Sequence, residues 1–326
     1  MLQNLIGLSR WTIRTPLNFL LNLVDHPVIV LVYHRVTTLS SDPEMLSVTP
    51  ENFRAQMHYL KNNVSLVSFA EDWTNVLKPA IAITFDDGYA DNALEALPIL
   101  EEVRVPATFF VTTGAIGSTR EFWWHELERI ILGSQSIPSS FTLNDSRFGR
   151  KWPTNNRSER QELYHEIVQL MKNSGPERRE DWLAQLRLWA HDTDGKGDTT
   201  HRAMTIEELR VLAASSWVTV GAHAVTHSRL SSLTTAAQRE EITASKKQLE
   251  SWLGKEITLF SYPFGKRSDF TKETAVLCRE AGFTKAAANF PGQAHKWTDP
   301  YRIPRLLVRN WSVEVFCEKL REFWTR

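Results

Sequence analysis

The chain has 326 residues, of which 42% are hydrophobic, and its 38 basic side chains balance 38 acidic ones. This composition is typical of a soluble globular protein, and the lack of a basic excess argues against a nucleic-acid-binding protein. The only cysteines are Cys278 and Cys317, so the chain alone can build neither a disulfide framework nor a thiolate metal cluster. Any metal site must therefore use histidines and carboxylates.

Residues 1–25 carry leucines, isoleucines and a tryptophan at helical spacing, with Arg10 and Arg14 among them. No small-residue cleavage site follows the apolar part, and no uninterrupted apolar run is long enough to span a bilayer. The pattern predicts an amphipathic helix, which either packs against the body of the protein or lies on a membrane surface. We expect a cytoplasmic protein, with peripheral contact on the inner face of the membrane as the alternative.

Short apolar or β-branched runs alternate with helical patterns from residue 27 onward. The runs cover residues 27–33, 80–85, 107–112, 217–222, 257–262, 285–289 and 303–308. The helical patterns cover residues 49–63, 92–103, 234–254 and 271–282. The first of these helices is expected to begin with Thr49 as its N-cap and Pro50 at its first position. Strands that alternate with helices indicate a parallel α/β sheet or barrel, and about seven repeats favour a barrel.

Residues 119–205 interrupt this alternation with three helical patterns, separated by clusters of Pro, Ser, Asn and Gly. We therefore predict a mostly helical insertion within a barrel that spans residues 26–326. Large aromatic side chains usually fill cores, so we expect the tryptophans of the insertion to pack its interior. The alternative is that one or two form a wall for a sugar ring. These tryptophans are Trp123, Trp124, Trp152, Trp182 and Trp189.

Polar side chains follow several predicted strands at the point where each strand ends. His34 follows the first run, and Asp86 with Asp87 follows the second. His223 and His227 follow the fourth. In a strand-helix barrel the carboxyl ends of the strands form the rim on which active sites are built, so these residues should converge. Two histidines and one aspartate supply two nitrogens and one oxygen to a metal and leave positions open for water.

Three short motifs occur along the chain in the order "TFDDGY" (84–89), "HAVTH" (223–227) and "SYPFG" (261–265). They resemble the first three motifs of the polysaccharide deacetylase family, which is carbohydrate esterase family 4 with its NodB-like domain. The segments "LVYHRV" and "RIPRLLV" further resemble the circularly permuted branch that includes poly-N-acetylglucosamine deacetylases. The resemblance covers most of residues 28–310 apart from the insertion.

The resemblance implies a distorted barrel and a metal-dependent hydrolase that removes an N-acetyl group from an amino sugar in a glycan or glycan precursor. Exopolysaccharide or lipopolysaccharide biosynthesis would use such an activity. The family pattern implies Asp86 as the general base and one divalent ion bound by Asp87, His223 and His227. Zinc is the expected ion, with cobalt, nickel or manganese as alternatives. His34 matches the general acid of the permuted branch.

The third motif implies that the backbone N–H of Phe264 holds the oxyanion of the reaction. Tyr262 of this motif and Tyr89 of the first motif are expected beside the substrate. Two positions depart from the family pattern. Ala224 stands where a hydroxyl residue commonly follows the first metal histidine, which should tune the site rather than abolish it. Ser261 stands where many members have an arginine that orients the catalytic aspartate. We expect Arg305, on the final predicted strand, to supply that charge instead and to lie near the substrate.

Two other functions stay open. One is a deformylase or deacetylase of a lipid-linked sugar at the cytoplasmic face of a membrane, which the N-terminal helix favours. The other is a catalytically inactive carbohydrate-binding module, whose expected mark is the loss of a base or a metal ligand. Asp86, Asp87, His223 and His227 are all present in this chain. In each case the expected partner is an acylated amino sugar.

Overall fold

The computed structural model describes residues 22, 25–74, 76–118, 120–133, 137–192 and 199–325. Apart from Asn22 and Asp25, the helix expected within residues 1–25 lies outside the described residues. Among the helices of the described ranges, none is long and apolar enough to cross a membrane.

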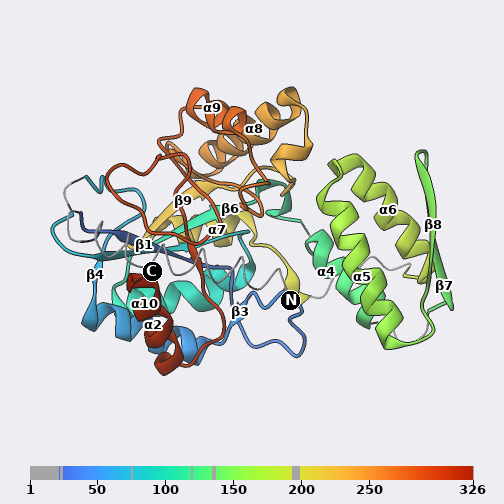
Figure 1. Cartoon of the computed structure of the whole chain (residues 1–326), viewed down its shortest axis with the longest axis horizontal. Helices are drawn as coiled ribbons and strands as arrows, with labels where there is room; N and C mark the ends of the chain where they lie inside the picture. The colour runs from blue at the N-terminus through green and yellow to red at the C-terminus, as the bar shows by residue number, and fades with distance from the viewer. Residues whose placement is uncertain are drawn as a thin grey trace, which may run out of the picture.

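A parallel sheet forms the centre of the fold (Figure 1). Its strands are β1 (Val28–Tyr33), β4 (Ser65–Leu66), β5 (Ala80–Phe85), β6 (Ala107–Val111), β9 (Val218–Ala222), β10 (Leu259–Ser261), β11 (Lys285–Ala287) and β12 (Leu306–Leu307). They lie in the order β11–β10–β9–β6–β5–β1–β12, and β4 pairs with β5 beside this path. Each of the seven predicted runs contributes a strand to this sheet, so the predicted α/β fold is confirmed.

The segment that leads into β12 brings the two edges of the sheet together. Ile303 forms a parallel bridge with Ala287 of β11, and the backbone N–H of Ala288 donates to the Ile303 carbonyl at 2.8 Å. Only a few residues later, β12 pairs with β1. Residues 303–307 therefore reach from one edge of the sheet to the other and curl it into a distorted barrel. Arg305 lies in the middle of this segment and is almost fully buried.

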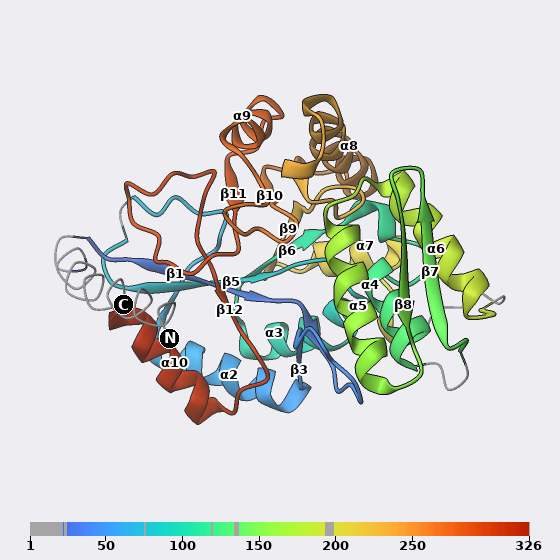
Figure 2. The same cartoon turned by 45° about the vertical axis from the view of Figure 1, so that its right-hand side comes forward.

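Helices surround the curled sheet (Figures 1 and 2). They are α2 (Pro50–Asn63), α3 (Leu97–Val103), α7 (Ile206–Ala214), α8 (Thr235–Leu253), α9 (Lys272–Glu280) and α10 (Val313–Thr325). In Figure 1, α8 and α9 lie above the sheet, and α2 and α10 lie below it. The N-cap of α2 is the predicted one, because Thr49 Oγ1 accepts the backbone N–H of Asn52 at 3.3 Å.

Shorter elements connect these layers. They are the two-residue strands β2 (Arg35–Val36) and β3 (Ser47–Val48), the π-helical turn η1 (Asn92–Ala96), and the 3₁₀ turns η2 (Thr113–Ala115), η4 (Thr199–His201) and η5 (Leu230–Ser232). The helical pattern predicted over residues 92–103 is therefore divided between η1 and α3. β2 begins two residues after the end of β1, and η2 begins two residues after the end of β6. Both therefore lie at the carboxyl edge of the sheet, where the predicted site residues are.

The insertion stands beside the barrel (Figures 1 and 2). It contains α4 (Trp123–Glu128), the π-helical turn η3 (Arg129–Gly133), β7 (Ser140–Asp145), β8 (Phe148–Pro153), α5 (Arg157–Lys172) and α6 (Pro176–Trp189). The antiparallel hairpin β7–β8 was not predicted. It packs through Phe141, whose ring lies 6.1 Å from that of Trp152 and 5.1 Å from that of Trp189. These tryptophans therefore pack the insertion, as predicted.

Candidate active site

The five residues predicted at strand ends line one cavity of about 370 Å³. His34 directly follows β1, Asp86 and Asp87 follow β5, and His223 follows β9. His227 lies four positions further along the same loop. Because β9, β5 and β1 are parallel strands of one sheet, their carboxyl ends open on the same edge and bring these side chains together.

Asp87, His223 and His227 form a compact cluster of buried atoms that can bind a metal. The Nε2 atoms of His227 and His223 lie 3.3 Å and 3.5 Å from Asp87 Oδ1. One ligand atom from each residue lies within 4.8 Å of the other two. Within the described part of the chain, Asp87 Oδ1 has no hydrogen-bond partner although it is buried. A divalent cation fits this donor set and would satisfy that oxygen.

The orientation of His223 also suits a metal ligand. Its Nδ1 lies 2.8 Å from the carbonyl oxygen of Ser261. A carbonyl can only accept, so Nδ1 carries the hydrogen and the Nε2 lone pair faces Asp87. Burial lowers the pKa of His227 to about 3, which keeps that imidazole neutral. Burial also lowers the pKa of His223, but the charges of Asp86 and Asp87 outweigh it, so a cation there would compete with a proton.

Two side chains that sequence reasoning missed hold the loop of His227 in place. Arg179 of α6 donates from Nη2 to the Thr226 carbonyl at 2.9 Å and to Ser228 Oγ at 2.8 Å. On the other side, Oε2 of Glu241 in α8 accepts two successive backbone N–H groups of the loop at 2.8 Å and 2.9 Å. Arg179 is only 4% exposed, so these are buried charge-assisted bonds. The insertion thus positions a predicted metal ligand.

Several non-glycine residues of the site have a left-handed backbone. The angle φ is 77° at Asp87, 61° at Ala224, 50° at His227 and 61° at Phe264. Such conformations cost on the order of 1–3 kcal/mol each and persist where surrounding contacts impose them. Strain of this kind clusters at functional sites in proteins. Its concentration around this cavity agrees with the placement of the site.

Asp86 has an environment different from that of its neighbour Asp87. Arg305 donates from Nη1 to Asp86 Oδ1 at 2.8 Å and from Nη2 to Oδ2 at 2.6 Å. The same Nη2 donates to Ser261 Oγ at 2.9 Å. Burial raises the pKa of Asp86, but Arg305 and the neighbouring imidazoles of His223 and His34 together outweigh burial, and the pKa lies below its usual value. Asp86 is therefore an ionised, oriented carboxylate at neutral pH, able to accept a proton.

His34 lies in the cavity wall and is 8% exposed. Its carbonyl accepts a hydrogen bond from Asn92 Nδ2 at 2.8 Å, while its Nδ1 has no partner among the described residues. Burial lowers the pKa of His34, so the ring is neutral near pH 7 and must gain a proton before it can donate one. His295, which stands late in the chain where unpermuted family members carry their acid, does not line this cavity; its Nδ1 lies 3.3 Å from Asp25 Oδ2.

The third motif offers a backbone donor and a buried ring. Phe264 lines the cavity, and its backbone N–H has no acceptor among the described residues. Tyr262 does not line the cavity, because its ring is in the core and its hydroxyl donates to the Tyr301 carbonyl at 3.0 Å. Tyr89 is also buried, and its hydroxyl accepts from Trp124 Nε1 at 2.9 Å. Neither tyrosine lines this cavity, and Tyr89 supports its wall through Trp124, so a place for either beside the substrate stays a prediction.

Aromatic rings surround the predicted ligand His227. The ring of Trp124 lies 4.8 Å and that of Phe264 lies 4.6 Å from the His227 ring. Trp123 and Trp124 line the cavity. These two tryptophans of the insertion are therefore placed where they could form a wall for a sugar ring, which was the alternative to packing.

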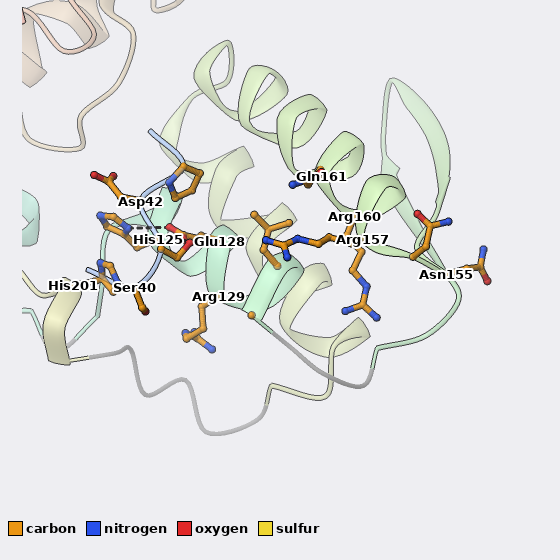
Figure 3. A pocket seen from close by; sticks show the side chains of 15 residues that line it. Ser40, Asp42, His125, Glu128, Arg129, Asn155, Arg157, Arg160, Gln161 and His201 are labelled. Atoms are coloured by element: carbon orange, nitrogen blue, oxygen red, sulfur yellow. Dashed lines mark hydrogen bonds and ion pairs between the residues drawn. The ribbon is translucent and has the colours of Figure 1, made fainter. Parts of the chain in front are cut away.

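A second and larger cavity, of about 820 Å³, lies beside the insertion (Figure 3). It is lined by three arginines and by residues 40–43. One of the arginines, Arg129, is already engaged by Glu121 at 2.5 Å and Asp192 at 2.9 Å. None of the predicted site residues lines this cavity. His125 lines this cavity, with its Nδ1 3.6 Å from Glu128 Oε2 (Figure 3), and its ring lies 6.0 Å from that of Trp124 in the wall of the first cavity.

Comparisons with known proteins agree with this arrangement. The profile of the family "Polysaccharide deacetylase" matches residues 74–174 and 196–286. YxkH of Bacillus subtilis (strain 168), which carries the polysaccharide deacetylase name, is 21% identical over 286 residues, covering 86% of this chain and 70% of YxkH.

Solved structures share the fold. BC0361, a polysaccharide deacetylase from Bacillus cereus, superposes with a TM-score of 0.58 at 20% identity, over 91% of this chain and 69% of that protein. A de-N-acetylase from Aggregatibacter actinomycetemcomitans superposes with a TM-score of 0.54 at 15% identity, over 91% of this chain and 99% of that one. The family profile covers more than half of the chain, and the predicted resemblance is confirmed. The chain belongs to the polysaccharide deacetylase family, hydrolases that act on carbon–nitrogen bonds other than peptide bonds.

Proposed function

We propose that this protein removes the N-acetyl group of an amino sugar, using a divalent cation held by Asp87, His223 and His227. One observation carries the proposal. A cluster of two imidazoles and one carboxylate shares its cavity with a second, ionised carboxylate, Asp86. The two groups are close, since His223 Nε2 lies 4.0 Å from Asp86 Oδ2. The adjacent aspartates thus have separate tasks.

A divalent cation in this cluster would polarise the acyl carbonyl and lower the pKa of a water molecule, which makes the water a nucleophile near neutral pH. Zinc is the ion that we propose first, because two imidazoles and one carboxylate with open positions suit it. Cobalt, nickel and manganese are the alternatives.

The side chains around the cluster supply the proton transfers. Asp86 accepts the proton of the attacking water, held in orientation by the two bonds from Arg305. A general base contributes on the order of 10²- to 10⁴-fold to the rate. The backbone N–H of Phe264 donates to the acyl oxygen as negative charge develops on it. His34 donates a proton to the departing amine, which is a poor leaving group without one.

We also propose that residues 26–326 act as one catalytic unit, with the insertion at 119–205 as part of its site. The support comes from contacts across the boundary of the insertion. Arg179 of α6 holds the loop of His227, and Trp123 and Trp124 line the cavity. An insertion of this kind would not be removable without loss of the metal site.

Mass spectrometry of sugars after incubation with the metal-loaded protein tests the proposal. N-acetylglucosamine oligomers should lose acetyl groups and release acetate, and the Asp86→Asn variant should release little. Release from N-formyl sugars alone would replace this proposal with the deformylase. Binding of sugars without any product would favour the inactive carbohydrate-binding module.

A further inference from the structure

Basic side chains surround the mouth of the site cavity. Apart from Asp86 and Asp87, the acidic residues that line it are Glu44 and Asp269. The basic ones, leaving the histidines aside, are Lys172, Arg229, Lys266 and Arg309. The proposed function already uses Asp86 and Asp87 as base and metal ligand, which leaves two carboxylates beside four basic side chains. A neutral sugar needs hydrogen-bonding groups rather than cations, so the four basic side chains call for an explanation.

The two arginines are engaged by the protein itself. Arg229 Nε lies 3.0 Å from Asp269 Oδ1. Arg309 Nη1 donates to the carbonyl oxygen of Glu44 at 2.6 Å and also to that of Met45. Both guanidinium groups thus tie together the loops that form the mouth. Their role in the fold is accounted for without a ligand.

The two lysines have no such partner. In the described part of the chain no carboxylate lies within ion-pair distance of Lys172 or Lys266. Asp269 is occupied by Arg229 and by the backbone N–H of Lys266, which donates to its Oδ2 at 2.8 Å. The Glu44 carboxylate lies near the Tyr164 hydroxyl, whose pKa burial raises and Glu44 raises further. The charges of the two lysines are therefore available to something that enters the cavity.

The lysines come from different parts of the chain and meet at the site. Lys172 is the last residue of α5 in the insertion, and its Nζ lies 4.9 Å from the ring centre of Phe264. Lys266 follows the third motif by one residue. Burial lowers the pKa of Lys172. The nearby charge of Lys266 lowers it further, whereas the charges of Glu44 and Asp269 raise it. Two like charges beside one cavity would be relieved by an anion between them.

We infer that the acylated sugar carries a negatively charged group, a phosphate or a carboxylate, which Lys172 and Lys266 bind at the mouth of the cavity. This inference rests on the proposed function, since it concerns the substrate of the same site. Lys172 lies beside the ring of Phe264, the predicted donor to the acyl oxygen, and Lys266 lines the same cavity two residues further along the chain, so the charged group lies close to the acylated ring. Lysine suits the task as a flexible point charge for either kind of anion.

Binding measurements on the full chain test the inference. Calorimetric titrations compare N-acetylglucosamine 1-phosphate and N-acetylmuramic acid with the neutral methyl glycoside of N-acetylglucosamine. We expect at least one anionic sugar to bind about tenfold more tightly than the neutral one, the effect of one charge-assisted hydrogen bond. The anionic sugar with the greater gain in affinity over the neutral glycoside shows whether the site prefers a phosphate or a carboxylate. Equal affinities for all three sugars would overturn the inference.

Variants assign the preference to the two lysines. The double variant Lys172→Gln/Lys266→Gln should lose the preference and keep its affinity for the neutral glycoside, which also shows that it is folded. Lys247→Gln, which removes an exposed lysine of α8, is the matched control and should keep the preference. Because a phosphate can bind a metal ion directly, the titrations are repeated without metal. The part of the preference for anionic sugars that depends on the two lysines should persist. A preference that survives in the double variant would contradict the inference.

Acetate release from the same sugars separates this inference from the proposed function. A lysine-dependent preference in binding without acetate release would contradict the proposed function and leave the anion site standing. Acetate release at equal efficiency from neutral and charged sugars would support the function and overturn the anion site.

Discussion

Arg305 holds both carboxylate oxygens of Asp86 in a paired arrangement, with distances of 2.8 Å and 2.6 Å. The two residues are separated by 219 positions in the chain and are both buried. The contact depends on the segment before β12, which closes the barrel and carries the arginine inside. A single ion pair thus links the closure of the fold to the protonation state and orientation of the predicted base.

Replacing Arg305 with Gln should impair both stability and catalysis. Breaking a buried ion pair by removing one partner costs about 3–5 kcal/mol, so the melting temperature should fall. Without the guanidinium, burial raises the pKa of Asp86, and the acidic limb of the pH profile of kcat/KM should move to higher pH. Arg305→Lys keeps the charge and should restore part of this shift. An unchanged acidic limb in a folded Arg305→Gln protein would remove Asp86 from the role of base.

Replacing His34 with Ala should keep the metal and lose amide hydrolysis. An imidazole is suited to protonate the leaving amine, whereas a nitrophenolate departs without protonation. The loss should therefore be large for an N-acetyl sugar and small for 4-nitrophenyl acetate. Since burial lowers the pKa of His34, kcat/KM of the wild type for the amide should also rise as the pH falls toward that pKa. Equal losses on both substrates would place the acid elsewhere.

Replacing Arg179 with Gln should weaken metal binding although Arg179 touches no metal. Its bonds to the Thr226 carbonyl and the Ser228 hydroxyl hold the loop that presents His227. Loss of such a supporting contact typically costs about 10- to 100-fold in metal affinity. Arg178→Gln is the matched control on the same helix, because Arg178 pairs with Asp145, 3.2 Å away, instead. Equal metal affinities in the two variants would show that the insertion does not position the ligand.

The strands and the converging site residues could be predicted because both are local in sequence. Each sheet strand is a short apolar run. Because the strands are parallel, the polar residue that follows each of them lies at the same edge of the sheet. Asp86, Asp87 and His223 therefore meet for the same reason that β5 and β9 lie in one sheet. The motif pattern then suggested what each residue does.

The contributions of the insertion could not be predicted in the same way. Arg179 lies 47 positions from Thr226, and nothing near either residue signals their contact. Lys172 has the pattern of an ordinary helix C-terminus, where a basic residue favours the helix dipole without any ligand. The β7–β8 hairpin has no continuous apolar run, because most of its residues are exposed or half-buried, and it lies between stronger helical patterns. Packing between distant segments decided these features.

A calorimetric titration of zinc into three forms of the protein tests the central claim most directly. The wild type and Asp86→Asn should each bind one equivalent of zinc, because Asp86 faces Arg305 and only Asp87 belongs to the ligand cluster. Asp87→Asn should bind zinc much more weakly, since one of three protein ligands is lost. Acetate release should be lost in both variants. If Asp86→Asn lost the metal while Asp87→Asn retained it, or if the wild type bound none, the division of roles between the two aspartates would be contradicted.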